Sequence, residues 1–203
     1  MGSWKKKFLL SVLLTSFLST GPAFAAQNFK DVSSTYWAAD TIQWAAEMNM
    51  INGYPDGTFQ PNKQVSEAEF LAMLIKFYAK DIEPTKIKTH WADDYYFFAA
   101  EYNYITSLSN RDTPILRQTV AEILCGANGK NYTGEQAVQY LLAKEWISGK
   151  VAGAATVPSF AGEDPLTRAE AVAFIKKAYD GGLIELKKRP IESSNPNEIP
   201  FMD

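Results

Sequence analysis

Internal repetition is the feature of this sequence that most restricts its fold. Trp37 and Trp91 are 54 residues apart, Ile51 and Ile105 have the same separation, and Ala-Ala-Glu stands at 45–47 and again at 99–101. A third, more distant copy follows over about residues 129–182. Repeats of this length form helix–loop–helix units that are too small to bury their own apolar faces, so they pack together. The sequence therefore predicts one mostly α-helical domain made of three repeats.

The spacing of apolar residues predicts helices within each repeat. Residues 37–51 carry apolar side chains at helical intervals and are followed by Asn52-Gly53, which should end the helix. The segment 53–59, Gly-Tyr-Pro-Asp-Gly-Thr-Phe, predicts a tight turn. Three pairs, each a hydroxyl residue with Glu or Gln three positions later, predict capping boxes at helix starts: Ser66 with Glu69, Thr133 with Gln136, and Thr167 with Glu170. Leu116 and Thr119 occupy those places in the second repeat, so that helix start should lack the cap.

The two ends of the chain differ from the repeats. Residues 1–25 contain three consecutive lysines, a mostly apolar stretch and an Ala-Phe-Ala pattern, which together predict a secretory signal peptide. A permanent membrane anchor is the weaker alternative, because the apolar run is shorter than the roughly 20 residues that span a bilayer. The predicted boundaries are 1–25 for the signal peptide, 26–182 for the domain (repeats at about 28–80, 81–128 and 129–182), and 183–203 for a flexible C-terminal tail.

Charge and composition exclude several classes of function. The formal net charge is −3, and removal of the three lysines in 1–25 leaves −6, so we expect no nucleic-acid partner. Cys125 is the only cysteine and His90 the only histidine, which leaves little from which to build a zinc site or a nucleophilic triad. Cys125 lies in an apolar stretch and should be buried. We expect no enzyme activity, no cofactor and no metal.

Several segments resemble the S-layer homology repeat. The resemblance is carried by Phe29-Lys30-Asp31-Val32, Trp37, the segment 51–59 and the segment 166–170, Leu-Thr-Arg-Ala-Glu. The second repeat matches only at Trp91, Ile105 and 115–118, so the second and third repeats are divergent. The resemblance implies a pseudo-threefold helical bundle of three tandem repeats. It also implies a secreted protein of the cell wall or S-layer.

The same resemblance implies an acidic glycan as the ligand. Members of the family hold secondary cell-wall polymers in grooves between repeats, typically through pyruvylated N-acetylmannosamine, and the cation of the Thr-Arg-Ala-Glu motif meets the ligand's carboxylate. A guanidinium at a helix start suits that role, because it offers a fixed fork of donors beside free N–H groups. The ligand-binding residues predicted in this way are Arg168, Arg117, Trp37, Trp91, Asp31 and Gly53. We expect no membrane contact after signal cleavage, and other envelope proteins are a second class of partner.

Each candidate has a structural alternative. The two arginines could be surface residues, the two tryptophans could belong to the core, and Asp31 could only end a turn. Glu67 stands where the cation of the first repeat belongs, so at most two cationic grooves are expected. Two other functions stay open: a structural or protein-interaction module that has lost polysaccharide binding, and a small wall-active enzyme that uses the acidic pairs Asp93-Asp94 or Glu163-Asp164.

Overall fold

The computed structural model describes residues 29–151 and 153–201, so the predicted signal peptide lies outside the described residues. Over these ranges the chain forms helices and no named strand; the helices are α1 (Ala39–Glu47), α2 (Glu67–Tyr78), α3 (Asp93–Glu101), α4 (Arg117–Ala127), α5 (Gly134–Ala143), α6 (Val157–Phe160), α7 (Arg168–Asp180) and a 3-10 turn, η1 (Pro196–Glu198). The predicted all-α fold is confirmed. No described helix is both long enough and apolar enough to cross a membrane.

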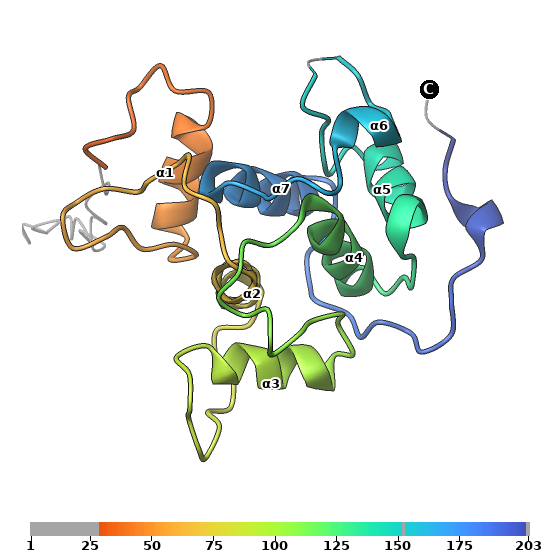
Figure 1. Ribbon diagram of the computed structural model, residues 1–203, viewed down its shortest axis with the longest axis horizontal. Coiled ribbons are helices and arrows are strands. Elements are labelled where there is room, and N and C mark those ends of the chain that lie inside the picture. The colour runs from red at the N-terminus through yellow and green to blue at the C-terminus, as the bar shows by residue number, and fades with distance from the viewer. Residues whose placement is uncertain (1–28, 152, 202–203) are drawn as a thin grey trace, which may run out of the picture.

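Helices α2, α4 and α7 converge at the centre, and α1, α3 and α5 lie around them (Figure 1). Each outer helix packs against the central helix of the preceding repeat: α3 against α2, α5 against α4, and α1 against α7. The last of these contacts closes the cycle between the third repeat and the first. No repeat therefore buries its apolar faces by itself, as the repeat length predicts.

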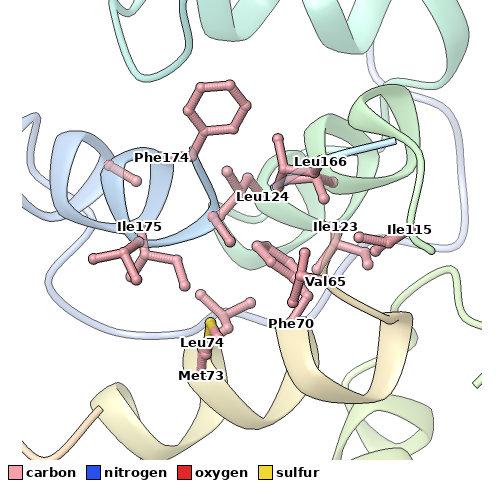
Figure 2. Close-up of a cluster of buried hydrophobic side chains, with 14 of the residues drawn as sticks. Val65, Phe70, Met73, Leu74, Ile115, Ile123, Leu124, Leu166, Phe174 and Ile175 are labelled. Carbon is pink, nitrogen blue, oxygen red and sulfur yellow. The ribbon is translucent and has the colours of Figure 1, made fainter. Parts of the chain in front are cut away.

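A closed ring of backbone hydrogen bonds joins the three central helices just before their first residues. The Val65 N–H donates to the Leu166 carbonyl (2.9 Å), the Leu166 N–H to the Ile115 carbonyl (3.0 Å), and the Ile115 N–H to the Val65 carbonyl (2.9 Å). The side chains of these residues lie in one apolar cluster with residues of the central helices, among them Phe70 and Leu124 (Figure 2). The pseudo-threefold arrangement is therefore present in the main chain.

Helix α1 ends earlier than its apolar spacing predicts. Helix α1 stops at Glu47 because Asn49 takes a left-handed φ of 55° and the Met50 N–H bonds back to the Ala45 carbonyl (3.0 Å). The same C-terminal motif follows α3 and α5, with Asn103 and Glu145 as the left-handed residues, both with φ of 59°. The chain then turns inward toward the central helix of its own repeat.

Two of the three predicted capping boxes are confirmed. Ser66 with Glu69 and Thr167 with Glu170 form the reciprocal bonds at the starts of α2 and α7. Helix α4 has no side-chain cap, as Leu116 predicts. The capping box at Thr133 is wrong: its side chain makes no cap bond, and the Gly134 N–H donates instead to a Glu122 carboxylate oxygen from α4 (2.8 Å).

Residues 183–199, expected to belong to a flexible tail, are bonded to the second and third repeats. The Arg189 N–H donates to the Tyr102 carbonyl (2.9 Å), and the Ser194 N–H to the Asn131 carbonyl (3.0 Å). The Tyr132 hydroxyl donates to the Asn195 carbonyl (2.9 Å). The Pro- and Ser-bearing composition did not reveal these contacts, because the tail makes them largely through its main chain.

Candidate ligand-binding grooves

Arg117 and Arg168 are the first residues of α4 and α7, and both are buried, with 1% and 5% of their surface exposed. The alternative that they are surface arginines is therefore wrong. The Arg117 side chain donates through Nε to the Phe160 carbonyl (2.7 Å), through Nη2 to the Ser148 carbonyl (2.8 Å), and through Nη1 to Glu170 (2.6 Å). Burial lowers the pKa of Arg117, and the Glu170 carboxylate opposes this effect.

Arg168 has a similar set of partners at the place that is related to Arg117 by the pseudo-threefold axis. Its Nε donates to the Phe59 carbonyl (2.9 Å) and its Nη1 to Glu69 (3.3 Å). Each guanidinium also lies near two aromatic rings, with ring-centroid distances of 5.0 and 4.8 Å for Tyr54 and Phe59 beside Arg168. For Arg117 these distances are 4.7 and 5.1 Å, to Phe160 and Phe174. Arg117 is thus held by two carbonyls and a carboxylate, Arg168 by one carbonyl and a carboxylate, and both by aromatic faces as well.

Arg117 lines a groove of about 850 Å³, here called the Trp37 groove. Trp37 comes from the first repeat, Arg117 from the second, and Glu170 and Lys177 from the third; the other lining residues include Tyr36, Asn62, Ser148 and Lys150. Trp37 is 64% exposed, so its assignment to the core is wrong. All three repeats therefore contribute to this groove.

A second site, here called the Trp91 groove, consists of two adjoining hollows of about 710 and 140 Å³ that share Glu69 and Trp91. Trp91 comes from the second repeat and is 54% exposed, so it too lies outside the core. Arg168 of the third repeat and Lys76 of the first also line this groove. The Trp91 groove therefore contains the same four residue types as the Trp37 groove.

Lys76 and Lys177 are groove residues that sequence reasoning missed. Each follows a capping-box glutamate by seven residues, Glu69 in α2 and Glu170 in α7. Seven residues are about two helical turns, so the glutamate and the lysine lie on one face of their helix. The recurrence of this spacing in the first and third repeats is the signal that could have identified the two lysines.

The corresponding place around the pseudo-threefold axis, here called the third position, has lost all four residue types. By alignment of the central helices and the outer helix ends, Glu67 replaces the arginine, Thr119 the glutamate, Gly126 the lysine and Thr133 the tryptophan. Glu67 is buried and accepts hydrogen bonds from the Tyr96 hydroxyl (2.8 Å) and the Ser107 N–H (2.8 Å). This arrangement agrees with the sequence analysis, in which Glu67 stands where the cation of the first repeat's motif belongs.

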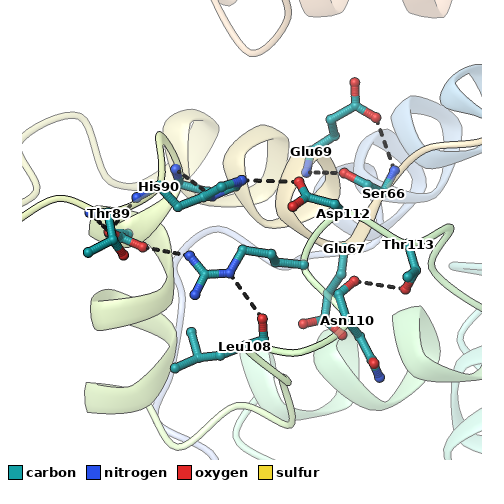
Figure 3. Close-up of polar contacts among 12 residues, drawn as sticks. Ser66, Glu67, Glu69, Thr89, His90, Leu108, Asn110, Asp112 and Thr113 are labelled. Atoms are coloured by element: carbon teal, nitrogen blue, oxygen red, sulfur yellow. Dashed lines mark hydrogen bonds and ion pairs between the residues drawn. The ribbon is translucent and has the colours of Figure 1, made fainter.

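Hydrogen bonds fix the residue that precedes each exposed tryptophan. The His90 ring is bonded to Asp112 (3.0 Å; Figure 3), and the Tyr36 hydroxyl donates to Asn62 (3.0 Å). The Ala92 N–H donates to His90 Nδ1 (3.2 Å), so Nε2 carries the hydrogen that Asp112 accepts. These contacts position Trp37 and Trp91 from the loops that border the grooves.

Asp31 and Gly53 line neither groove. The Asp31 carboxylate accepts hydrogen bonds from the N–H groups of Phe59 (2.8 Å) and Gln60 (2.7 Å). A Cβ on Gly53 would lie 2.5 Å from the Phe29 ring, so only glycine fits there. Both residues shape the loop whose Phe59 carbonyl holds Arg168.

The other residues considered as chemical groups in the sequence analysis have structural contacts. Asp93 and Asp94 accept hydrogen bonds from the segment before α3, the first from the His90 N–H (2.8 Å) and the second from the Thr85 N–H (2.7 Å). Cys125 is buried, as predicted. Within residues 29–151 and 153–201, no three His, Cys, Asp or Glu side chains cluster in a way that could hold a metal ion.

Comparison with known proteins identifies a domain in the first repeat. Residues 28–71 match the S-layer homology domain. The chain is 37% identical over 99 residues to a cellulosome-anchoring protein of Acetivibrio thermocellus. This match covers 42% of the chain and 22% of that protein. It is 27% identical over 125 residues to the middle cell wall protein of Brevibacillus brevis, a match that covers 61% of the chain and 12% of that protein. It is 25% identical over 199 residues to exoglucanase XynX of A. thermocellus, a match that covers 85% of the chain and 18% of that protein. The chain thus spans at most 22% of the length of these three relatives. The first repeat therefore contains an S-layer homology domain at residues 28–71, as its sequence resemblance predicts.

Proposed function

We propose that this protein attaches non-covalently to the cell wall by binding an acidic secondary cell-wall polysaccharide in the Trp37 and Trp91 grooves. One observation carries the proposal: the two grooves are built from the same four residue types, taken each time from all three repeats. Different segments of the chain converge on one arrangement, which favours one ligand for both grooves. The names of the cellulosome-anchoring protein and the middle cell wall protein support attachment to the envelope.

The chemistry of the grooves suits an acidic sugar. An exposed indole offers a flat apolar face to the C–H side of a pyranose ring, while hydroxyl and amide groups at the rim can bond its hydroxyls. The positive charges nearby favour a carboxylate, and they act locally because the predicted mature chain is acidic overall. A pyruvate ketal on N-acetylmannosamine would supply that carboxylate, and this is the ligand we propose. Binding of this kind involves no covalent step.

Two grooves on one domain would strengthen attachment to a polymer. Once one sugar is bound, a second along the same or a neighbouring glycan binds at a raised effective concentration. Modest affinity at each groove is then enough for stable attachment. The name exoglucanase carries no activity over to this chain, because the match covers 18% of that protein.

A second candidate function is that of a structural or protein-interaction module of the envelope. The third position favours it, since a repeat can evidently keep the fold after losing its groove residues. This function predicts a folded protein that has no affinity for wall polymer and that crosslinks to a defined envelope protein.

Co-sedimentation with cell walls tests the proposal. The chain lacking residues 1–25 should sediment with native sacculi, and markedly less with sacculi from which pyruvyl groups have been removed. The double variant Trp37→Ala/Trp91→Ala should bind about a hundredfold more weakly, at roughly 1.4 kcal/mol for each lost stacking contact. Phe97→Ala is the matched control, because Phe97 is a half-exposed aromatic residue outside both grooves. Equal sedimentation of the double variant, or equal binding to both wall preparations, would contradict the proposal.

A further inference from the structure

We infer that Lys177 and Lys76, and not the two buried arginines, supply the positive charge that meets the carboxylate of the ligand. The inference rests on the proposed function. It gives a role to two residues that lie outside the Thr-Arg-Ala-Glu motif, one in each groove.

The arginines are already engaged within the protein. Arg117 directs three of its N–H groups to two carbonyls and to Glu170, and its side chain is 1% exposed. Arg168 has a carbonyl and Glu69 as partners, and its side chain is 6% exposed. An incoming carboxylate would have to share each guanidinium with a resident carboxylate of like charge. The arginines therefore serve chiefly to hold the walls of the grooves.

The two lysines carry positive charge that no carboxylate offsets. Lys177 and Lys76 are exposed on α7 and α2. Across the described residues neither is paired with an acidic side chain, whereas Lys63, Lys150 and Lys176 are paired with Glu69, Asp164 and Asp180. Lys177 Nζ donates to the Ser148 hydroxyl, a neutral partner that also lines the Trp37 groove. An ammonium on a flexible stem can reach a sugar's carboxylate without a fixed approach geometry.

The third position gives an internal comparison. Its central helix, α4, has Gly126 where α2 and α7 have the lysines. A Cβ on Gly126 would lie 3.2 Å from Arg189 of the C-terminal segment, so that segment covers the place of the missing side chain. The lysine is thus present at the two places that keep the tryptophan and glutamate, and absent where these are lost.

A double-mutant cycle between the charge of the ligand and the charge of the lysines tests the inference. The probe is the methyl glycoside of pyruvate-ketal N-acetylmannosamine, used as the free acid and as its uncharged methyl ester, with affinities measured by calorimetry. For the wild-type chain we expect the acid to bind about tenfold more tightly than the ester, as for one close charge pair in a partly exposed site. In Lys76→Gln/Lys177→Gln this ratio should fall to about one, because only the charged ligand loses its partner.

Two further variants complete the design. Lys76→Arg/Lys177→Arg should keep the preference for the acid, and Lys176→Gln should behave as wild type, because Lys176 is paired with Asp180. Substitution of exposed lysines should leave the unfolding midpoint unchanged, which shows that any loss of binding is local. A preference for the acid that survives in Lys76→Gln/Lys177→Gln overturns the inference and leaves the proposed function standing. A wild-type chain that binds neither probe overturns both.

Discussion

The Trp37 groove, the Trp91 groove and the third position have the same backbone arrangement but different side chains. The ring of bonds through Val65, Ile115 and Leu166 is nearly uniform, at 2.9 to 3.0 Å, and all three first helices end in the same left-handed turn. The side chains that could bind a ligand are present at two places and replaced at the third. The difference teaches that main-chain bonds and apolar packing maintain the fold, while four side-chain positions decide whether a groove can bind.

Glu67→Arg should have the largest effect on stability. It would place a buried cation beside Thr119, where the other two arginines have a glutamate, and would remove the acceptor of the Tyr96 hydroxyl. We expect a loss of about 4 kcal/mol in the free energy of unfolding, measured by urea denaturation. Glu67→Arg/Thr119→Glu should recover part of this loss without creating a third ligand site, since the tryptophan and the lysine are still missing. Full stability of the single variant would contradict the alignment of the three positions.

Arg117→Leu should lower the free energy of unfolding by about 3 kcal/mol. The substitution leaves the Phe160 and Ser148 carbonyls and the Glu170 carboxylate without their donor. The matched control is Arg111→Leu. Arg111 lies in the loop before α4, is more exposed, and pairs with Asp93 (2.9 Å) and the Leu108 carbonyl (3.0 Å; Figure 3). Its loss should cost about 1 kcal/mol. Equal losses of unfolding free energy in the two variants would show that Arg117 stabilises the fold no more than a partly exposed arginine does.

The helix starts allow a smaller test of the same comparison. Thr167→Ala should destabilise the protein by about 1 kcal/mol, because it removes a formed capping box. Leu116→Thr should stabilise it by a few tenths of a kcal/mol, because α4 has no side-chain cap and Leu116 is 36% exposed. Thermal unfolding of the two variants should shift in opposite directions, and a shift in the same direction would contradict this account of the caps.

The smallest expected effect is on acid stability. The side-chain bond from Lys88, with the Thr85 N–H, lowers the pKa of Asp94 to about 2, against about 3.9 for an unfolded chain. A lowered carboxyl pKa stabilises the folded state above pH 4, and this contribution is lost as the pH falls from about 4 to about 2. Asp94→Asn should therefore show a weaker loss of stability over that interval, measured by urea denaturation at several pH values. An unchanged pH dependence would show that the Asp94 contacts make no net contribution.

Much of the fold followed from local sequence patterns. The repeat spacing predicted three helical units. The capping pairs at Ser66 and Thr167 marked the starts of two central helices, because a capping box acts within a few residues. The end of α1 was misjudged, because apolar side chains continue past Glu47 although the backbone has already turned at Asn49. The contacts of the C-terminal segment were missed, because main-chain bonds leave no trace in composition.

The site was predictable only in part. The family resemblance named Arg117, Arg168 and the two tryptophans, and all four lie at the grooves. It could not show that the arginines are buried and paired, since their partners are 31 to 109 residues away in the chain. Asp31 and Gly53 were chosen from the same family resemblance, but they support a loop, because a family pattern contains residues that the fold needs as well as residues that the ligand needs.

The stoichiometry of ligand binding tests the central claim most directly. Calorimetric titration of the mature chain with the pyruvylated monosaccharide should give two sites per chain, and titration of Trp37→Ala or Trp91→Ala should give one strong site. Three sites in the wild-type chain would mean that the third position binds ligand without the four groove residues. Two strong sites remaining after either tryptophan is removed would mean that the ligand binds elsewhere, and either result would contradict the account.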